Sequence, residues 1–517
     1  MSIILLLLKI KDTCCKILLA CFILVIFSQK VTIGQAPNNS VVYSNLSLEP
    51  VIAKPGQPVL ISIDVNNREK VPTEVRFKLY INGSLESEHA IALKPYENKT
   101  VSLPVSRFQP GPYSVRINSE SHNIINYSEE VGSFATSKFP RAVRAGEYTY
   151  YGYVGFDGRI IINKRNRKNG EIISTILGKV QSIDDHSSPY IYVNKNGRIF
   201  VWWYDRKSRN TIHQARSIHP FGMKFEHSHI PVRRVDYPIA FHDGGALYLI
   251  YRSDHHGGKW QFIKSYDEGQ TWTSPILFYE GSAWPYLHTF QDSIQEGLHI
   301  VRGGQTIHSN DFNVYYIYLN NGNFYSANRT HLGSIEDMLP LSETSMEIIK
   351  SADKERQRAM EVLEHEGRMY VLIASNITAK TGPDGNYIYE RAHFSQRKNT
   401  WIIEKVVESN YGGPGTLAQF PLYATMNQAN PDLVYGSVYR PEKDQIDIGL
   451  FSRQSDESWK RIDWITESPE NDIIPQAVRY TDDELLWHRG NYKGFTDFNT
   501  QIFGTQLRIF MVKETKN

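Results

Sequence analysis

One stretch of the sequence, Ser265-Tyr266-Asp267-Glu268-Gly269-Gln270-Thr271-Trp272, decides the fold. It fits the pattern S-x-D-x-G-x-T-W, called an Asp-box, in which the Ser and Asp side chains hold a tight turn between two strands. The Gly takes a backbone angle that other residues avoid, and the Trp is expected to pack between strands. Ser455-Asp456-Glu457-Ser458-Trp459 is a degenerate second copy. We expect both copies to be structural and to lie away from any catalytic site.

A repeated unit surrounds this stretch from about residue 140 onward, in which a Gly- or Asp-centred turn joins two apolar strands. Clear copies centre on residues 157–158, 196–197, 244–245, 296–297 and 366–367, and weaker copies on 431–432 and 482–483. Their spacing of roughly 40 to 70 residues is typical of propeller blades. Because a blade buries its faces only against its neighbours, the repeats predict a closed seven-bladed β-propeller over residues 138–517. Residues 351–358 are the clearest helical candidate within it.

The region before the repeats, residues 37–137, has a different residue pattern. Apolar and polar residues alternate over 59–63, 75–80 and 113–117, with turn signals at short intervals. This pattern predicts an all-β module, for which an immunoglobulin-like β-sandwich is the natural architecture. The module shows no aromatic cluster or acidic loop that would form a sugar or calcium site. We expect a spacer or docking module, with glycan binding as the alternative.

The first 36 residues have the layout of a secretory signal peptide. Lys9, Lys11 and Lys16 precede the apolar run 17–27, which is shorter than the roughly 20 residues that span a bilayer. The sequence therefore predicts export to the periplasm or the medium, without stable membrane insertion after the signal is removed. Residues 18–21 faintly resemble a lipoprotein box, but the apolar run continues past Cys21, so lipid anchoring is the less favoured alternative.

All three cysteines of the chain, Cys14, Cys15 and Cys21, lie in this leader. The mature protein is therefore expected to lack disulfides, cysteine-ligated metals and thiol nucleophiles. A formal net charge of +2 argues against a nucleic-acid binder held by bulk charge. It leaves room for a local basic cleft that binds an acidic polymer, and we expect a monomer.

Several short motifs follow one another in a single order over residues 140–510. They are Asp184-Asp185-His186-Ser187-Ser188-Pro189, Asp236-Tyr237-Pro238, Tyr251-Arg252-Ser253, Trp284-Pro285-Tyr286, the stretch 303–308, the stretch 486–490, and Tyr492 with 496–500. With the Asp-box, they make this portion similar to the BNR-repeat proteins that include the propeller-type ulvan lyases. The resemblance implies a secreted lyase that cleaves a uronate-containing, sulfated, ulvan-like polysaccharide without a catalytic cofactor.

A lyase of this kind removes the proton at C5 of a uronate and expels the glycosidic oxygen at C4. The reaction needs a base, an acid for the leaving oxygen, and a cation for the carboxylate. The resemblance places His186, Tyr237 and Arg252 at the catalytic positions, and their chemistry suits the three roles. Each also has a plainer interpretation: His186 as a capped turn residue, Tyr237 as a strand-edge residue before Pro, and Arg252 as the partner of a nearby Asp.

Related lyases carry a second histidine about one strand after the first, and this sequence does not. The corresponding stretch, 203–207, offers Arg206 for carboxylate contact, or His213 could reach in from the next strand. The resemblance further implies that Trp284, Tyr286 and His308 line the substrate groove. No catalytic metal is expected, because adjacent histidines at 255–256 diverge on a strand, while a structural ion is left open.

Two other functions compete with the lyase. A glycoside hydrolase of sialidase type shares Asp-boxes, but it needs three arginines and a Tyr/Glu pair that cannot be assembled here in family order. A non-catalytic glycan-binding propeller is favoured by the missing second histidine. If the lyase prediction is right, His186, Tyr237, Arg252 and Tyr286 must meet in one groove on one face of the wheel.

Overall fold

The computed structural model describes most of the chain between residues 41 and 512. The gaps are residues 50–51, 54–57, 82–83, 108–110, 118–124, 129, 135–141, 168–169, 255, 257, 283–284, 292–296, 305–310, 353–355, 377–385, 410–422, 467–469, 482–483, 495 and 507–508. The predicted signal peptide lies outside the described residues. Among those described, no helix has the length and apolar character needed to cross a bilayer. The chain divides into two compact units, one including Leu60–Phe77 and His89–Leu103, the other including Lys78–Glu88 and the chain from Pro104 onward.

Strands from the N-terminal part form two sheets. The first contains β1 (Val41–Glu49), β3 (Val59–Asn67) and β6 (Asn98–Val105). The second runs in the order β2 (Ile52–Ala53), β39 (Ile509–Val512), β7 (Gly111–Ile117), β4 (Thr73–Ile81) and β5 (Ser84–Leu93). In β3 every second residue, from Val59 to Asn67, is buried, as the alternating sequence predicts. The immunoglobulin-like topology stays a prediction.

Seven antiparallel sheets follow one another in the described part of the chain that comes after these strands. The first three comprise β10 (Ala142–Ala145), β11 (Tyr148–Gly155), β12 (Arg159–Asn166) and β13 (Ile172–Lys179), with β9 (Gly132–Ser133) beside β11; β14 (Tyr190–Val193), β15 (Ile199–Trp203), β16 (Thr211–Ser217) and β17 (Phe225–Pro231); and β18 (Asp236–Asp243), β19 (Ala246–Asp254), β20 (Lys259–Ser265) and β21 (Ile276–Glu280).

The other four sheets repeat this meander. They comprise β22 (Pro285–Gln291), β23 (Leu298–Gly304), β24 (Val314–Asn320), β25 (Asn323–Tyr325) and β26 (His331–Ser334), with β27 (Glu347–Lys350) beside β24; β28 (Arg356–His365), β29 (Arg368–Asn376), β30 (Tyr387–Ser395) and β31 (Thr400–Ser409); β32 (Ala424–Met426), β33 (Leu433–Arg440), β34 (Gln445–Arg453) and β35 (Trp459–Trp464); and β36 (Asp472–Ala477), β37 (Glu484–Gly494), β38 (Asp497–Gln506) and β8 (Ile125–Asn126). Short helices are η1 (Asp185–Ser187), α2 (Ile335–Met338) and η2 (Glu343–Ser345).

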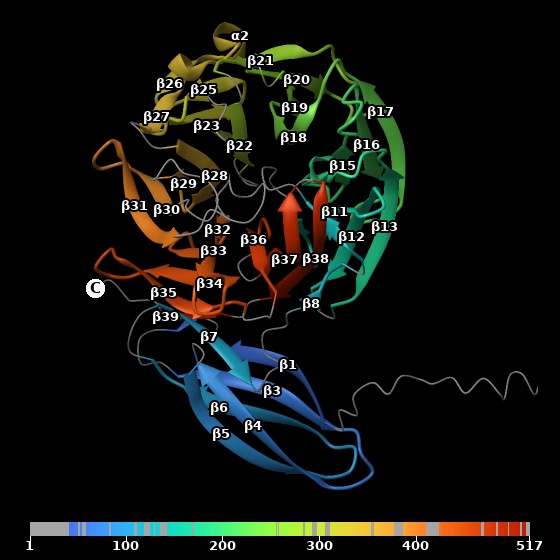
Figure 1. Ribbon diagram of the computed structural model, residues 1–517, viewed down its shortest axis with the longest axis vertical. Helices are drawn as coiled ribbons and strands as arrows, with labels where there is room; N and C mark the ends of the chain where they lie inside the picture. Colours follow the sequence, from blue (N-terminus) through green and yellow to red (C-terminus); the bar gives the residue numbers. More distant parts are fainter. Residues whose placement is uncertain are drawn as a thin grey trace, which may run out of the picture. The chain divides into compact units, whose positions relative to one another are not determined.

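The sheets surround a common centre, with β18, β22 and β28 near it and β17, β21 and β31 outside (Figure 1). Consecutive innermost strands contact one another, as β10 does with β14, and β28 with β32. This arrangement is that of a β-propeller. Because each sheet begins at its innermost strand and all sheets are antiparallel meanders, the innermost strands all start at one face of the wheel and end at the other.

The Asp-box forms the turn between β20 and β21. The Asp267 carboxylate accepts hydrogen bonds from the Thr271 backbone N–H at 2.8 Å and from the Thr271 hydroxyl at 2.6 Å. The Ser265 hydroxyl accepts from the Gly269 N–H at 2.7 Å, and Gly269 has φ +80°, as the pattern predicts. Trp272 packs against the core. The structural role of the motif is confirmed.

The ring is closed by residues that precede the first complete sheet. β8 pairs with β38, and β9 pairs with β11, so residues 125–126 belong to the last sheet and residues 132–133 to the first. β39, near the C-terminus, pairs with β2 and β7. These pairings cross the expected domain boundary at residue 137 in both directions. The helical expectation for 351–358 is wrong for residues 356–358, which begin β28 and pair with 374–376 of β29.

Glu484 links the last sheet to the first. Its buried carboxylate contacts Arg165 Nη1 at 3.1 Å and Arg167 Nε at 3.4 Å, and it accepts hydrogen bonds from the hydroxyls of Thr149 and Tyr127. Thr149 lies in β11, Arg165 in β12 and Arg167 just after β12, while Tyr127 directly follows β8 of the last sheet. One carboxylate therefore joins the two ends of the ring.

We expect Glu484→Ala to lower the free energy of unfolding by about 3 to 5 kcal/mol, because it leaves a buried guanidinium without its anion. Urea unfolding measures the change. The control is Glu457→Ala, which removes an exposed carboxylate 3.2 Å from Arg453 and should change stability little. Equal effects of the two substitutions would contradict the closing role of Glu484.

Candidate active site

The predicted site residues lie where innermost strands begin. His186 is in η1, directly before β14, while Tyr237 and Tyr286 are the second residues of β18 and β22. Arg252, near the end of β19, pairs in register with Asp236, the first residue of β18. Since the starts of these strands share one face of the wheel, the four side chains are brought to the same place from three sheets.

The local sequence turns Tyr237 toward this face. The register of β18 shifts between Asp236 and Ile239, which marks a bulge, and Tyr237 has φ +55°. Pro238 is tolerated at a bulge because no ladder hydrogen bond is needed there. Bulges of this kind re-aim side chains next to functional sites, and a left-handed non-glycine residue costs on the order of 1 kcal/mol.

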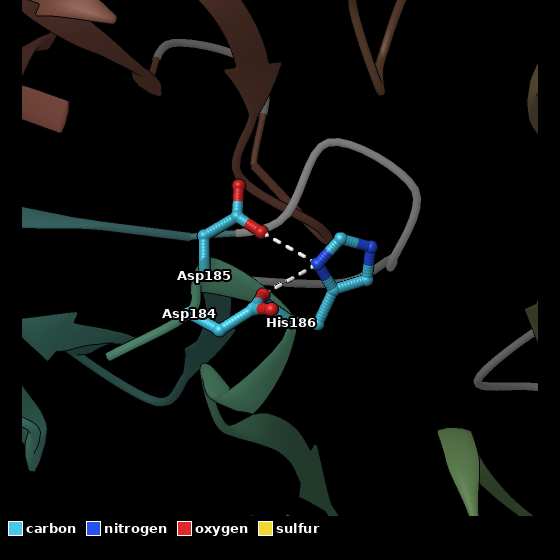
Figure 2. A group of neighbouring side chains, drawn as sticks. All are labelled: Asp184, Asp185 and His186. Atoms are coloured by element: carbon cyan, nitrogen blue, oxygen red, sulfur yellow. Dashed lines mark hydrogen bonds and ion pairs between the residues drawn. The ribbon is translucent and has the colours of Figure 1, made fainter. Parts of the chain in front are cut away.

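His186 is held by two carboxylates, as Figure 2 shows. Its Nδ1 lies 2.6 Å from Asp184 Oδ1 and 2.9 Å from Asp185 Oδ1, and Asp184 also caps η1 by accepting from the His186 N–H. The hydroxyl of Tyr492 donates to the other oxygen of Asp185. Nδ1 is therefore the protonated nitrogen, and the neutral ring carries its lone pair on Nε2.

Asp184, Asp185 and His186 are also a group of described residues spaced to hold a metal ion, with ligand atoms within 4.8 Å of one another. The ring nitrogen already contacts both carboxylate oxygens at hydrogen-bond distance. The 2.6 Å distance is that of a hydrogen bond between His186 Nδ1 and Asp184 Oδ1. The expectation of no catalytic metal stays a prediction.

Asp236 is the hub of the charged groups beside this histidine. Its carboxylate lies 2.9 Å from Arg206 Nη1, 3.3 Å from Arg252 Nη2 and 3.4 Å from Arg209 Nη1, and it is buried. Burial raises the pKa of Asp236, but the three guanidinium groups outweigh it and lower the pKa below its ordinary value. The pairing of Arg252 with an Asp and the capped turn at His186 match the plainer interpretations of both residues.

Tyr237 and Tyr286 form a pair under Arg252. Their hydroxyls are 3.5 Å apart, and the Arg252 guanidinium carbon lies 4.6 Å from the centre of each ring. The rings of His186 and Tyr237 are 5.7 Å apart. Burial raises the pKa of Tyr237 well above its ordinary value. Burial opposes ionisation of Tyr286 too, but Arg252 lowers its pKa below the ordinary value. Burial therefore favours the protonated form of Tyr237.

Arg206, rather than His213, joins the cluster. Besides Asp236, Arg206 Nε lies 3.6 Å from Asp184 Oδ2, and 23% of its side chain is exposed, against 2% for Arg252. The ring of His213 stacks on Trp203 at 5.4 Å and contacts His229 through Nδ1 at 3.1 Å, on the outer side of the sheet. Trp284 and His308 lie outside the described residues, so their predicted groove contacts stay predictions.

The cluster is nearly closed to solvent and carries a positive balance. His186, Tyr237, Arg252 and Tyr286 are between 1% and 6% exposed. Three carboxylates (Asp184, Asp185 and Asp236) face Arg206, Arg209 and Arg252, and the charge of Arg358 also acts on Tyr286. Four guanidinium groups against three carboxylates favour an anionic ligand.

Six residues of this cluster, Arg209 and Arg358 among them, had no role in the sequence interpretation. Asp184 and Asp185 precede His186, and Asp236 precedes Tyr237, so their adjacency in the motifs was the available signal. Tyr492 lies 307 positions from Asp185, its hydrogen-bond partner, and only its membership in a motif marked it. The aspartates could have been found because they are adjacent in sequence to predicted site residues. Tyr492 could not, because it reaches the site from another sheet.

Asp184 gives the fold a defined acid sensitivity. Burial raises its pKa, but the hydrogen bond and charge of His186, helped by Arg206, outweigh burial and lower the pKa to about 2. Because the folded-state pKa is lowered, the Asp184 carboxylate stabilises the fold fully at pH values above its unfolded pKa of about 3.9. This contribution disappears as the pH falls toward its folded-state pKa of about 2. We expect a loss of about 2 kcal/mol over this window.

Urea unfolding, followed from neutral pH downward, measures this loss. Asp184→Asn cannot titrate, so its stability should fall less steeply with acid than that of the native chain. An identical acid profile for the two proteins would show that Asp184 does not titrate as the geometry requires.

The comparisons with known proteins bear on the family and the fold. Residues 148–408, just over half of the 517-residue chain, match the model of the BNR repeat-containing family. The chain belongs to this family. The matched residues include His186, Arg206, Tyr237, Arg252 and Tyr286. No curated protein matches the sequence significantly.

Several solved structures resemble this chain in fold. Two structures of a polysaccharide lyase described as an ulvan lyase, one of them bound to a GlcA(1-4)Rha3S unit, each match 75% of this chain and 97% of their own, with a TM-score of 0.58 and 14% identity. The β-propeller domain of the trilobed protease from Pyrococcus furiosus matches 75% of this chain and 100% of its own, with a TM-score of 0.39 and 8% identity. At 14% identity the likeness shows the fold alone.

Proposed function

We propose that the protein is an exported polysaccharide lyase that cleaves an acidic, uronate-containing polymer by β-elimination. The observation that carries the proposal is the cluster in which an imidazole, a tyrosine pair and arginines from three neighbouring sheets meet at the starts of the innermost strands. The seven sheets support a seven-bladed wheel, and the leader sequence supports export.

Each group fits one step of the elimination. His186 Nε2 takes the proton from C5, since Asp184 and Asp185 hold the proton of Nδ1 on the other side of the ring. The C5 electron pair forms the C4–C5 double bond, the bond from C4 to the glycosidic oxygen breaks, and the Tyr237 hydroxyl protonates that oxygen. Arg206 and Arg252 neutralise the carboxylate, Arg206 as the more exposed cation.

The substrate proposal is a sulfated, ulvan-like polymer. The positive balance of the cluster supports an anionic chain, and the solved lyase with the same propeller fold binds a unit of glucuronate and sulfated rhamnose. The missing second histidine is compensated, in this proposal, by Arg206 in the same stretch of sequence. Tyr286 holds Tyr237 in place through the contact between their hydroxyls.

Incubation with ulvan and with other uronate polymers tests the proposal. Elimination creates an unsaturated uronate that absorbs in the ultraviolet, so absorbance should rise together with the number of reducing ends. New reducing ends without absorbance would mean hydrolysis, as in the sialidase alternative. Retention on a polymer column with neither signal would mean a glycan-binding propeller. Either result would overturn the lyase.

A further inference from the structure

A cavity of about 680 Å³ lies at the opposite ends of the innermost strands from the catalytic cluster. Residues that line it include Tyr192 and Val193 at the end of β14, His242 near the end of β18, and Gln291, the last residue of β22. Tyr286 and Gln291 are five residues apart on β22, which is about 17 Å along a strand. None of His186, Tyr237, Arg252 and Tyr286 lines the cavity, so it is separate from the cluster.

The inner wall of the cavity is a connected set of polar and aromatic groups. The Tyr192 hydroxyl lies 2.7 Å from His242 Nδ1, the side chain of Gln291 accepts from the His242 N–H at 3.2 Å, and the Tyr480 hydroxyl donates to the Gln291 carbonyl at 3.1 Å. These bonds fix the orientation of rings and hydroxyls before any ligand arrives. Phe221 adds a half-buried aromatic ring.

The outer wall is made by the Asp-box turn. Tyr266 and Glu268, the two variable positions that flank Asp267 in the motif, both line the cavity, and Tyr266 is 73% exposed. The Glu268 carboxylate accepts from Asn194 at 3.2 Å and lies 3.8 Å from Arg198. The motif residues Asp267 and Thr271 hold the turn, so the exposed ring of Tyr266 can face a ligand.

The rim carries positive charge. Arg144 and Lys195 are exposed and line the cavity from two neighbouring sheets. Among the described lining residues the carboxylate is that of Glu268, which has Asn194 and Arg198 as partners. Aromatic faces combined with fixed hydrogen-bonding groups suit a sugar ring, and basic groups at the rim suit an anionic substituent.

We propose that this cavity is a second saccharide-binding site, which binds a sugar unit carrying a carboxylate or sulfate group. It is built independently of the catalytic cluster, and the proposal holds whether or not the protein cleaves the polymer. A polymer chain bound here would be held on the face opposite to the cluster.

Calorimetric titration with an oligosaccharide of glucuronate and sulfated rhamnose tests the site, using Tyr237→Phe as a background that does not consume the ligand. We expect two binding events in this background. The additional pair Arg144→Ala and Lys195→Ala should weaken one of them by at least about tenfold, the scale of losing a hydrogen bond to a charged group. The matched control, Arg397→Ala with Lys398→Ala, removes two exposed basic residues that do not line the cavity and should change neither event.

Tyr266→Ala, which removes only an exposed ring, should weaken the same event by several-fold, because the ring offers a face for stacking. A neutral oligosaccharide and inorganic sulfate separate the parts of the proposal. A single binding event that the cavity variants leave unchanged would overturn the site. If the neutral oligosaccharide binds as tightly as the acidic one, the claim that the ligand is anionic is overturned. If inorganic sulfate alone binds as tightly, the claim of a saccharide site is overturned and the cavity is an anion site.

Discussion

Tyr237→Phe is expected to lower turnover on a uronate polymer by at least about 100-fold, while polymer binding changes little. The substitution removes one hydroxyl whose pKa is raised by burial, and which lies 3.5 Å from the Tyr286 hydroxyl under the Arg252 guanidinium. Without that donor, the glycosidic oxygen leaves as an alkoxide, so the chemical step slows. Steady-state rates with a polymer column for binding measure both quantities.

Tyr251→Phe provides the matched control. Tyr251 is a buried tyrosine next to Arg252 on β19, but its hydroxyl contacts Gln261 rather than the cluster. The same chemical change there should leave turnover near that of the native chain. Near-normal turnover for Tyr237→Phe would remove Tyr237 from the mechanism and pass the proton-donor role to Tyr286 or His186.

His186→Ala is expected to lower turnover by a similar factor, at least about 100-fold, because the base that removes the C5 proton is lost. Asp184→Asn should lower it less, since the imidazole remains and only one of the two carboxylates that orient Nδ1 is changed. Asp184 is thus a positioning residue, and its substitution should shift the pH profile of turnover, which a purely structural role would leave in place.

His213→Ala is the control for histidine chemistry. His213 stacks on Trp203 and contacts His229, away from the cluster, so its loss should affect turnover little. A larger loss for His213→Ala than for His186→Ala would show that the second histidine of related lyases is supplied from β16, and that the cluster described above is structural.

The sequence predicts the repeating part of this fold better than its closure. The Asp-box and the turn-centred repeats carry their own local signals, because a turn and its two strands are made by neighbouring residues. The pairing of β8 with β38 joins Asn126 to Phe503, and β39 pairs with β7, at separations where no local pattern exists. Residues 356–358 form a strand by pairing with 374–376 of β29, a partner that the residue types at 356–358 do not reveal.

The candidate site, like the fold, has a part that the sequence predicts and a part that it does not. The motifs bring His186, Tyr237, Arg252 and Tyr286 to attention, and the structure brings these four together. The joint anchoring of Arg206, Arg209 and Arg252 by Asp236 depends on three separate segments converging, which residue types alone do not predict. The cavity at the opposite ends of the innermost strands went unpredicted for the same reason, because its walls come from sequence-distant strand ends and an Asp-box turn.

The mass of the new chain end tests the central claim most directly. Ulvan is digested in heavy-oxygen water and the oligosaccharide products are weighed. The lyase account predicts products whose non-reducing ends are unsaturated uronates and which gain no heavy oxygen when the chain is cleaved. Products that carry one added water, with heavy oxygen at the cleaved bond, would contradict elimination and identify the protein as a hydrolase.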